Sequence, residues 1–217
     1  MILAIYCCGG FGKEILLLAK EINQIHHRWN KMFFVDDNFN KKQFKGLTVL
    51  DFQSFQNEYA PDECEFTIAS GEPYLRKILS EKVEDAAYKL CTLIHPDIRI
   101  ADDTVIENGC IICKGTVITD DVYIGKCTMV NLLCSIGHDV NIGNYCAIQP
   151  HCSISGNVHI GDSTHIGTHS AIRDEVTIGP NCIIGMGSIV TKNIKANCIA
   201  YGSPAKIIRE NNTKLVF

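Results

Sequence analysis

The second half of the chain repeats one hydrophobic position every six residues. Counting in steps of six from Ile100, every step as far as Val190 falls on Ile or Val. This period fits neither the 3.6-residue repeat of an amphipathic helix nor the two-residue alternation of a hairpin strand. Hexapeptide periodicity is typical of a parallel β-helix, in which three hexapeptides make one coil of about eighteen residues. The pattern therefore predicts stacked coils that bury one another and are not stable singly.

Before the repeat, short apolar runs alternate with amphipathic stretches. We expect them to form, in order, a strand at 2–6, a helix at 13–22, strands at 31–38 and 65–70 and a helix at 72–87. Glu14 is expected in the first turn of the first helix, where a carboxylate is favourable. Such alternation predicts a small, Rossmann-like parallel α/β domain. We assign residues 1–92 to this domain and residues 93–217 to the β-helix with its C-terminal tail.

The composition of the chain limits the kinds of binding partner that we expect. The chain has 217 residues and a formal charge of -4, without a long Lys/Arg block, which argues against binding to nucleic acid or to a membrane surface. The apolar start, residues 1–6, lacks the basic region and cleavage site of a signal peptide, and no later apolar run is long enough to span a bilayer. We therefore expect a cytoplasmic protein with a small-molecule partner.

The twelve cysteines read as reduced thiols, because no secretory signal accompanies them. Several stand two residues before a repeat-defining isoleucine, a slot otherwise filled by Thr, Ser and Val: Cys110, Cys134, Cys146, Cys152 and Cys182. Free cysteine packs well as a small hydrophobic residue. We expect these side chains to fill the interior of the coil.

A glycine-rich turn follows the first strand and partly matches the dinucleotide fingerprint G-x-G-x-x-G. Gly9 and Gly12 fit, whereas Cys7 replaces the first glycine. Ligands of open α/β sheets bind outside the carboxyl ends of the strands, where polar residues also follow the next strands. The predicted substrate site comprises Gly9, Gly10, Gly12, Asp36, Asp37, Ser70 and Gly71. A tight strand-to-helix turn without a ligand is the alternative, and the small size of the domain favours a nucleotide-linked substrate over NAD.

His138 and Asp139 interrupt the repeat with a pair that can move protons. His138 lies two residues after an inward isoleucine, so its side chain should point outward, between Asp120 on the coil below and Gly156 on the coil above. Coils are about 4.8 Å apart by ordinary β spacing. Asp139 could orient the imidazole, and Gly156 leaves space and a backbone N–H beside it. A solvated surface histidine is the alternative.

The order of these motifs, completed by Gly202 to Lys206 as G-x-P-A-K, resembles the sialic acid O-acetyltransferase and bacillosamine N-acetyltransferase family. The resemblance covers essentially the whole chain and implies a left-handed β-helix, a homotrimer with active sites between subunits, and acetyl-CoA as co-substrate without a metal. It also implies that His138 is the general base, Asp139 its acidic partner and Asn131 a substrate contact, with Asp36 and Asp37 near the nucleobase. Phe11 departs from the family, which often has His there.

For acetyl-CoA we predict a groove that includes Gly156, His151, His169, Gly185 and Lys206. His151 and His169 should stack on adjacent coils, although a solvated pair is the alternative. His159 and His165 occupy equivalent slots on different faces, so they should not meet within one chain. This arrangement disfavours the three-histidine zinc site of carbonic anhydrases built on the same coil.

The sequence thus predicts an acetyl-CoA-dependent N-acetyltransferase acting on a nucleotide-linked amino sugar, with a 4-amino-4,6-dideoxyhexose on dTDP or UDP as the expected substrate. O-acetylation of a sialic acid or similar sugar is an alternative, in which the same base would activate a hydroxyl. A zinc carbonic anhydrase or a non-catalytic binding trimer is the alternative of another class.

Overall fold

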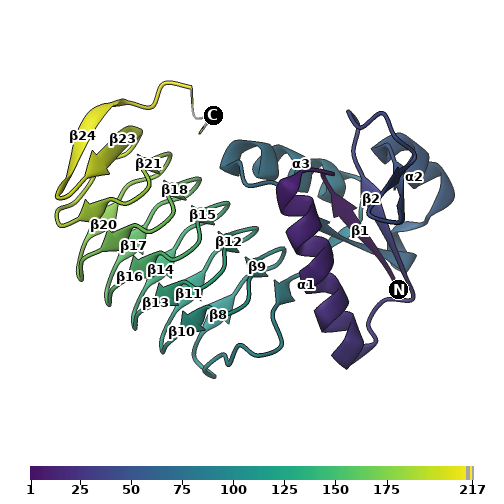
Figure 1. The fold of residues 1–217 in the computed structure, drawn as a ribbon, viewed down its shortest axis with the longest axis horizontal. Helices are drawn as coiled ribbons and strands as arrows, with labels where there is room; N and C mark the ends of the chain where they lie inside the picture. The colour runs from purple at the N-terminus through teal and green to yellow at the C-terminus, as the bar shows by residue number, and fades with distance from the viewer. Residues whose placement is uncertain (214–215, 217) are drawn as a thin grey trace.

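A computed structural model describes residues 1–213 and 216 as an α/β domain followed by a long coil of short strands (Figure 1). The end of the predicted 93–217 region, namely Lys214, Leu215 and Phe217, lies outside the described residues. No described helix combines the length and apolar character needed to cross a bilayer.

The α/β domain is built on a six-stranded sheet in the order β3-β4-β2-β1-β5-β6, in which only the β3–β4 pair is antiparallel. Its strands are β1 (Ile2–Tyr6), β2 (Lys31–Val35), β3 (Gln43–Phe44), β4 (Leu47–Leu50), β5 (Cys64–Ile68) and β6 (Lys89–Leu90). Its helices are α1 (Gly10–His26), α2 (Phe52–Glu58), the 3-10 helix η1 (Pro61–Glu63) and α3 (Pro73–Asp85). Alternate residues of β1 pack into separate apolar clusters, Leu3 with helix α1 and Tyr6 with Phe52 and Leu79 of α2 and α3, so helices cover both faces of the sheet.

Two features of this domain differ from the sequence-based expectation. Helix α1 begins at Gly10, and its first turn holds no acidic residue, so the placement of Glu14 in that turn was wrong. The glycines suggested a loop because glycine is a poor helix former, but the chain enters the helix directly from Gly9. The segment that forms β3, β4 and α2 was not predicted, because its aromatic residues follow no clear period.

The coil is a left-handed parallel β-helix with three faces, as predicted. Face 1 carries β7 (Leu93–Ile94), β9 (Ile111–Ile112), β12 (Met129–Val130), β15 (Ala147–Ile148), β18 (His165–Ile166), β21 (Ile183–Ile184), β23 (Cys198–Gly202) and β24 (Ala205–Glu210). Face 2 carries β8 (Val105–Ile106), β11 (Tyr123–Ile124), β14 (Asn141–Ile142), β17 (His159–Ile160) and β20 (Thr177–Ile178). Face 3 carries β10 (Val117–Ile118), β13 (Ser135–Ile136), β16 (Ser153–Ile154), β19 (Ala171–Ile172) and β22 (Ile189–Val190). Pairing such as Ser135 with Ser153 confirms that residues eighteen apart stack.

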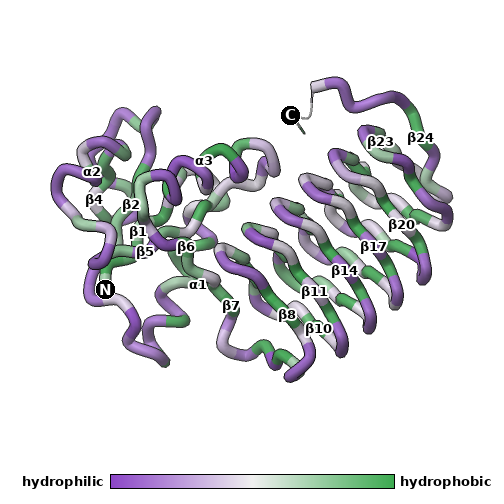
Figure 2. Tube along the Cα trace, turned by 180° about the vertical axis from the view of Figure 1, so that it is seen from behind, coloured by the Kyte–Doolittle hydropathy of each residue, from purple (hydrophilic) through white to green (hydrophobic). Residues whose placement is uncertain are grey.

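The interior of the coil explains the cysteine pattern. Apolar positions recur along the coil (Figure 2), and the repeat-defining residues from Ile112 to Val190 are buried. At one corner Cys and Thr alternate, and from Cys110 to Thr164 each donates to a carbonyl fifteen residues on, as Cys110 Sγ does to Gly125 O at 3.1 Å and Thr128 Oγ1 to Gly143 O at 2.7 Å. The five cysteines predicted to fill the interior of the coil are all buried. Cys110 and Cys113 have Cys-x-x-Cys spacing, but burial raises the pKa of both thiols to about 12, which makes them unreactive.

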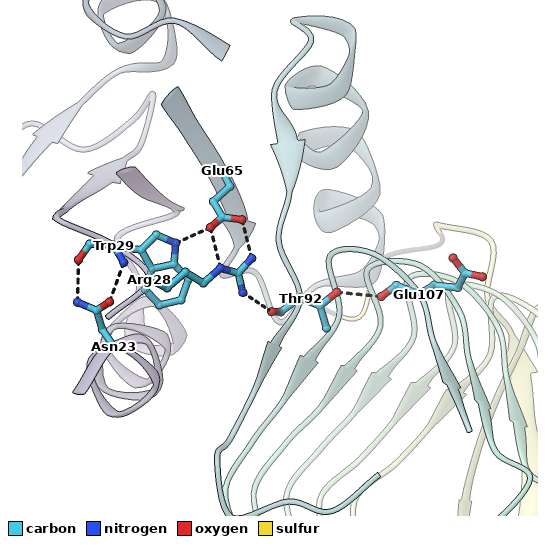
Figure 3. Close-up of polar contacts among 6 residues, drawn as sticks. All are labelled: Asn23, Arg28, Trp29, Glu65, Thr92 and Glu107. Carbon is cyan, nitrogen blue, oxygen red and sulfur yellow. Dashed lines mark hydrogen bonds and ion pairs between the residues drawn. The ribbon is translucent and has the colours of Figure 1, made fainter. Parts of the chain in front are cut away.

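A polar network ties the α/β domain to the start of the coil (Figure 3). The buried Glu65 carboxylate accepts from Arg28 Nε at 2.8 Å, from Arg28 Nη2 at 2.6 Å and from Trp29 Nε1 at 2.6 Å. Thr92 then donates through Oγ1 to Glu107 O at 3.1 Å. Strand β6 pairs within the first sheet and β7 within face 1, so the predicted division between residues 92 and 93 falls between them.

Candidate active site

His138 and Asp139 lie at the corner between faces 3 and 2, in the turn from β13 to β14. Asp139 has φ 57°, one of a series of left-handed corner residues spaced six apart. This turn brings Asp139 Oδ2 to 2.7 Å from His138 Nδ1, although both side chains are more than half exposed. An ionised carboxylate can only accept, so Nδ1 donates this bond, and a neutral imidazole held in this way has its lone pair on Nε2. The pair therefore has the arrangement of an oriented general base.

Gly156 lies directly over the imidazole, as the eighteen-residue stacking predicts. A Cβ built on Gly156 would stand 2.6 Å from His138 Cε1 and 2.7 Å from Nε2. The backbone joins the same two coils, since Asn157 N donates to His138 O at 2.9 Å. Within residues 1–213 and 216, the Gly156 amide donates to no acceptor. The absence of a side chain at Gly156 thus lets the His138 ring lie against the backbone of the next coil.

Below His138 the same corner is acidic. Asp139 N donates to Asp120 O at 3.1 Å, and a hydrogen bond with Asp103 raises the pKa of the Asp120 carboxyl. Asp103, Asp120 and Asp121 are the one group of three or more potential metal ligands in the described part of the chain, and all three are exposed. That group contains no histidine, so it does not have the ligands of a catalytic zinc site.

In the α/β domain, the first position of the glycine-rich turn has a backbone conformation that is typical of glycine. Cys7 has φ 88°, a conformation that ordinarily favours glycine, at the position where the fingerprint has its first glycine. Gly12 is required by packing, because its Cβ would collide with the Cys7 carbonyl. At Gly9 and Gly10 a Cβ would meet no atom within 4 Å, so their backbone is open to a ligand.

Asp36 and Asp37 lie at the carboxyl end of β2, as expected, and both are engaged. Asp36 Oδ2 accepts from Cys8 N at 2.7 Å, which ties it to the glycine-rich turn. Asp37 accepts from Tyr6 OH at 2.6 Å and from Lys82 Nζ at 2.6 Å. Burial raises the pKa of Asp37, but the hydrogen bonds from these two donors outweigh that effect and hold the pKa below its usual value. Both acids line an open cavity of about 460 Å³ that also includes Phe39, Lys41 and Lys42.

Ser70 and Gly71 lie against the coil rather than beside that cavity. Gly71 lines a second cavity of about 480 Å³ between the domain and face 1, together with Gln149, His165, Gly167, Gly185 and Met186. The structure thus brings a predicted substrate residue, Gly71, and a predicted coenzyme residue, Gly185, to one cavity. His159, by contrast, is exposed on face 2, which confirms that it and His165 do not share a face.

The other predicted coenzyme residues lie elsewhere. The rings of His151 and His169 stack as predicted, with centroids 4.6 Å apart and an interplanar angle of 9°, at the corner between faces 1 and 3. Lys206 is exposed on β24. Asn131 follows β12 on face 1, is buried, and accepts from Leu132 N at 2.7 Å. Within one chain, a strand of face 3 therefore separates both Asn131 and the stacked histidines from His138.

Known proteins share both halves of this arrangement. Residues 2–83 match the PglD N-terminal domain, and residues 157–192 match the bacterial transferase hexapeptide model of six repeats. The structure of WeeI from Acinetobacter baumannii AYE superposes with a TM-score of 0.88 at 30% identity, over 96% of this chain and 100% of that one. This chain belongs to the hexapeptide-repeat sugar acetyltransferase family.

Two other members of the family are informative. The acetyltransferase domain of PglB from Neisseria gonorrhoeae FA1090, in complex with acetyl coenzyme A, has a TM-score of 0.88 at 25% identity, over 95% of this chain and 98% of that one. The GDP-perosamine N-acetyltransferase of Escherichia coli O157:H7 is 29% identical over 136 residues, 62% of this chain. That match spans 61% of the length of this curated relative.

Two buried polar residues of the chain, both near the junction of its two parts, were not predicted from the sequence. His165 is 7% exposed on face 1, and burial lowers its pKa to about 4, so its imidazole is neutral. Arg76 of α3 is 1% exposed and reaches the coil. One feature of the sequence could have indicated that His165 is buried. Its neighbours on face 1, eighteen residues before and after it, are the apolar residues Ala147 and Ile183.

Proposed function

We propose that this protein is an acetyl-CoA-dependent N-acetyltransferase that acts on a nucleotide-linked amino sugar. The observation that carries the proposal is the His138 Nδ1 to Asp139 Oδ2 contact of 2.7 Å, with the ring lying against the backbone of Gly156. A carboxylate that orients an exposed imidazole supports a role for His138 as general base. The relatives support the reaction class, since one is a GDP-perosamine N-acetyltransferase and another was solved with acetyl coenzyme A.

In the proposed mechanism, acetyl transfer is direct. His138 Nε2 removes a proton from the sugar amine as the nitrogen attacks the thioester carbonyl, and a C–N bond forms. The Gly156 N–H donates to the carbonyl oxygen as negative charge develops on it. When the tetrahedral intermediate collapses, the C–S bond breaks and the imidazolium returns its proton to the coenzyme A sulfur. Asp139 stabilises the imidazolium between these steps, and no acyl-enzyme forms.

The nucleotide is assigned to the α/β domain. The cavity of about 460 Å³ offers the Phe39 ring for stacking, the Lys41 and Lys42 ammonium groups for phosphate, and Asp36 for polar contact with the base. The sequence favoured dTDP or UDP, whereas the curated relative is named for GDP-perosamine. The substrate class we propose is therefore a nucleoside-diphosphate amino sugar that includes the GDP-linked form.

We further propose that the site is completed between subunits of a homotrimer. His138 occupies one corner of the coil, and the stacked pair His151 and His169 occupies another. A second copy that packs against face 3 would bring the two corners together, so that each active site takes residues from two chains. A cytoplasmic location stays a prediction.

The test is a panel of GDP-, UDP- and dTDP-linked amino sugars with acetyl-CoA, read by mass spectrometry. We expect gain of one acetyl group on the amine of at least one substrate. Acetylation only of hydroxyl sugars would establish the O-acetyltransferase alternative. Loss of activity after treatment with a chelator, restored by zinc, would establish the metal-dependent one.

A further inference from the structure

Arg76 is the largest fully buried side chain of the described residues, and it carries a charge. It lies on α3, and each of its bonds goes to a backbone carbonyl. Nε donates to Cys127 O at 2.7 Å, Nη2 donates to Tyr145 O at 2.9 Å and to Cys146 O at 2.7 Å, and Nη1 donates to Ser70 O. Burial lowers its pKa to about 10, so the guanidinium is still charged at neutral pH.

Burial of the Arg76 charge costs more free energy than burial of an apolar side chain at the same position would. A buried charge whose partners are only neutral carbonyls loses hydration without gaining a counter-charge. Replacement of buried ionic groups by apolar side chains of similar size is often neutral or stabilising, so stability alone does not account for Arg76. We therefore look for the role of Arg76 in the segments that its five-donor guanidinium group joins.

The fork joins three places that are far apart in the sequence. Cys127 and Tyr145 are eighteen residues apart and therefore lie on adjacent coils, at the corner between faces 2 and 1. Ser70 begins the Ser70–Gly71 turn, whose Gly71 lines the cavity of about 480 Å³ together with Gly185. Arg76 thus bonds the predicted substrate turn and two coils of the predicted coenzyme domain through one rigid group.

Other polar ties also join the two parts of the chain, among them Val216 N to Glu72 Oε2 at 2.9 Å, and two of them lie near the β6–β7 link. Arg28 Nη1 donates to Thr92 O at 3.5 Å, and His95 Nε2 is 3.0 Å from Glu21 Oε2. Helix α1 also packs against face 1 in one apolar cluster that includes Leu18 and Met129, so the body of the domain is held without Arg76. Arg76 supplies a tie at the substrate turn itself, so its loss would release Ser70 and change the gap between Gly71 and the coil.

We propose that Arg76 is a positioning residue for acetyl transfer, which fixes the Ser70–Gly71 turn against the coil and thereby sets the separation of the two substrates. The inference rests on the proposed function. A purely structural residue would affect folding, whereas a positioning residue affects use of the sugar in protein that is fully folded. Misplacement of reacting groups by about 1 Å can cost on the order of a hundredfold in rate.

The chain offers a matched control on the same helix and the same corner. Lys126 Nζ is 2.6 Å from Glu84 Oε2, which also joins α3 to the coil, but this ion pair is part exposed and touches no residue of the substrate turn. An exposed pair of this kind contributes little to stability. Lys126→Met therefore removes a tie between the same elements without releasing Ser70.

The experiment compares Arg76→Met, Arg76→Lys and Lys126→Met as full-length proteins below their thermal unfolding temperatures. We expect Arg76→Met to lower kcat/KM for the nucleotide sugar by about tenfold or more, with acetyl-CoA affinity, measured by calorimetry, within about twofold of wild type. Hydrogen exchange should become faster in residues 70–72. Arg76→Lys, which keeps the charge but lacks the fork, should show a smaller loss of about threefold or more, and Lys126→Met should show neither change.

If Arg76→Met does not fold, the kinetics and hydrogen exchange of Arg76→Lys test the proposal instead. Wild-type kcat/KM and wild-type exchange at residues 70–72 in a folded Arg76 variant would overturn the proposal and leave a structural role only. Equal losses in Lys126→Met would overturn it as well, because any tie to the coil would then suffice. Failure of the proposed function has a different signature, since the wild-type protein itself would then transfer no acetyl group.

Discussion

Replacement of Gly156 by Ala tests the geometry around His138 with a single methyl group. The new Cβ would stand 2.6 Å from His138 Cε1, well inside the ordinary van der Waals contact of about 3.5 Å between carbon atoms. The backbone of Gly156 does not have a positive φ, so alanine itself is not strained there. The exposed imidazole must therefore swing aside by about 1 Å and weaken its 2.7 Å contact with Asp139.

The expected effects on activity and stability differ greatly. A displacement of about 1 Å in a catalytic group costs on the order of a hundredfold in rate, so kcat should fall by about that factor. The free energy of unfolding should change by less than about 1 kcal/mol, because an exposed ion pair contributes little. Alanine also restricts the unfolded chain, which opposes that loss by about 0.4–1 kcal/mol.

A double-mutant cycle identifies the cause. Unfolding free energies from urea titration and kcat are measured for wild type, Gly156→Ala, His138→Ala and the double variant. In the His138→Ala background the methyl group meets no ring, so Gly156→Ala should become neutral or slightly stabilising and should cause no further loss of kcat. Asp174→Ala, eighteen residues further along the same exposed corner, is the control. Full turnover by Gly156→Ala would refute the assignment of this glycine beside the base.

Three further predictions follow from the same geometry. Asp139→Asn should lower kcat less than deletion of the base does, by roughly tenfold to a hundredfold, because it keeps the imidazole but loses the charge at 2.7 Å; steady-state kinetics would contradict this by showing a loss equal to that of His138→Ala. Asp36→Ala should raise the KM for the nucleotide sugar and leave acetyl-CoA affinity nearly unchanged, since Asp36 lies in the α/β domain; calorimetry that showed the reverse pattern would mean that the ligands are assigned to the wrong domains. His165→Gln should make the free energy of unfolding less sensitive to acid. Burial lowers the pKa of His165 to about 4 in the folded protein, so the unfolded chain takes up a proton first as the pH falls. The wild-type protein should therefore lose up to about 3 kcal/mol of stability between about pH 6.5 and about pH 4, and the variant should not lose this contribution. Urea titrations at pH 7 and pH 4.5 that gave the same loss for both proteins would contradict that cause.

The coil and the corner that carries His138 were predictable because a strict period fixes their geometry. A register of eighteen residues places Gly156 over His138 by counting alone, and the structure has the two within contact distance of an added methyl group. Adjacent residues need no knowledge of the tertiary fold to meet, and Asp139 does reach His138. The buried cysteines followed from the same counting.

Contacts between the two parts of the chain could not be predicted in this way. Arg76 reaches acceptors 51 and 69 residues away in the sequence, and its partners are backbone carbonyls, which carry no signal in the sequence. His165 occupies a slot that looks like any other position on the outer surface of the coil until the α/β domain is placed over face 1. The beginning of α1 was misplaced because tertiary packing of Gly12 against Cys7 outweighs the low helix propensity of glycine.

The most direct test of the account is single-turnover acetyl transfer by wild type and His138→Ala, with both proteins saturated with acetyl-CoA and the preferred nucleotide amino sugar. Mass spectrometry follows the acetylated sugar, and calorimetry confirms that both proteins bind the coenzyme equally. We predict that the first turnover slows by about 10²–10⁴-fold in His138→Ala, because the variant binds both substrates but cannot remove the proton from the amine. A first turnover at the wild-type rate would contradict the central claim that His138 is the general base.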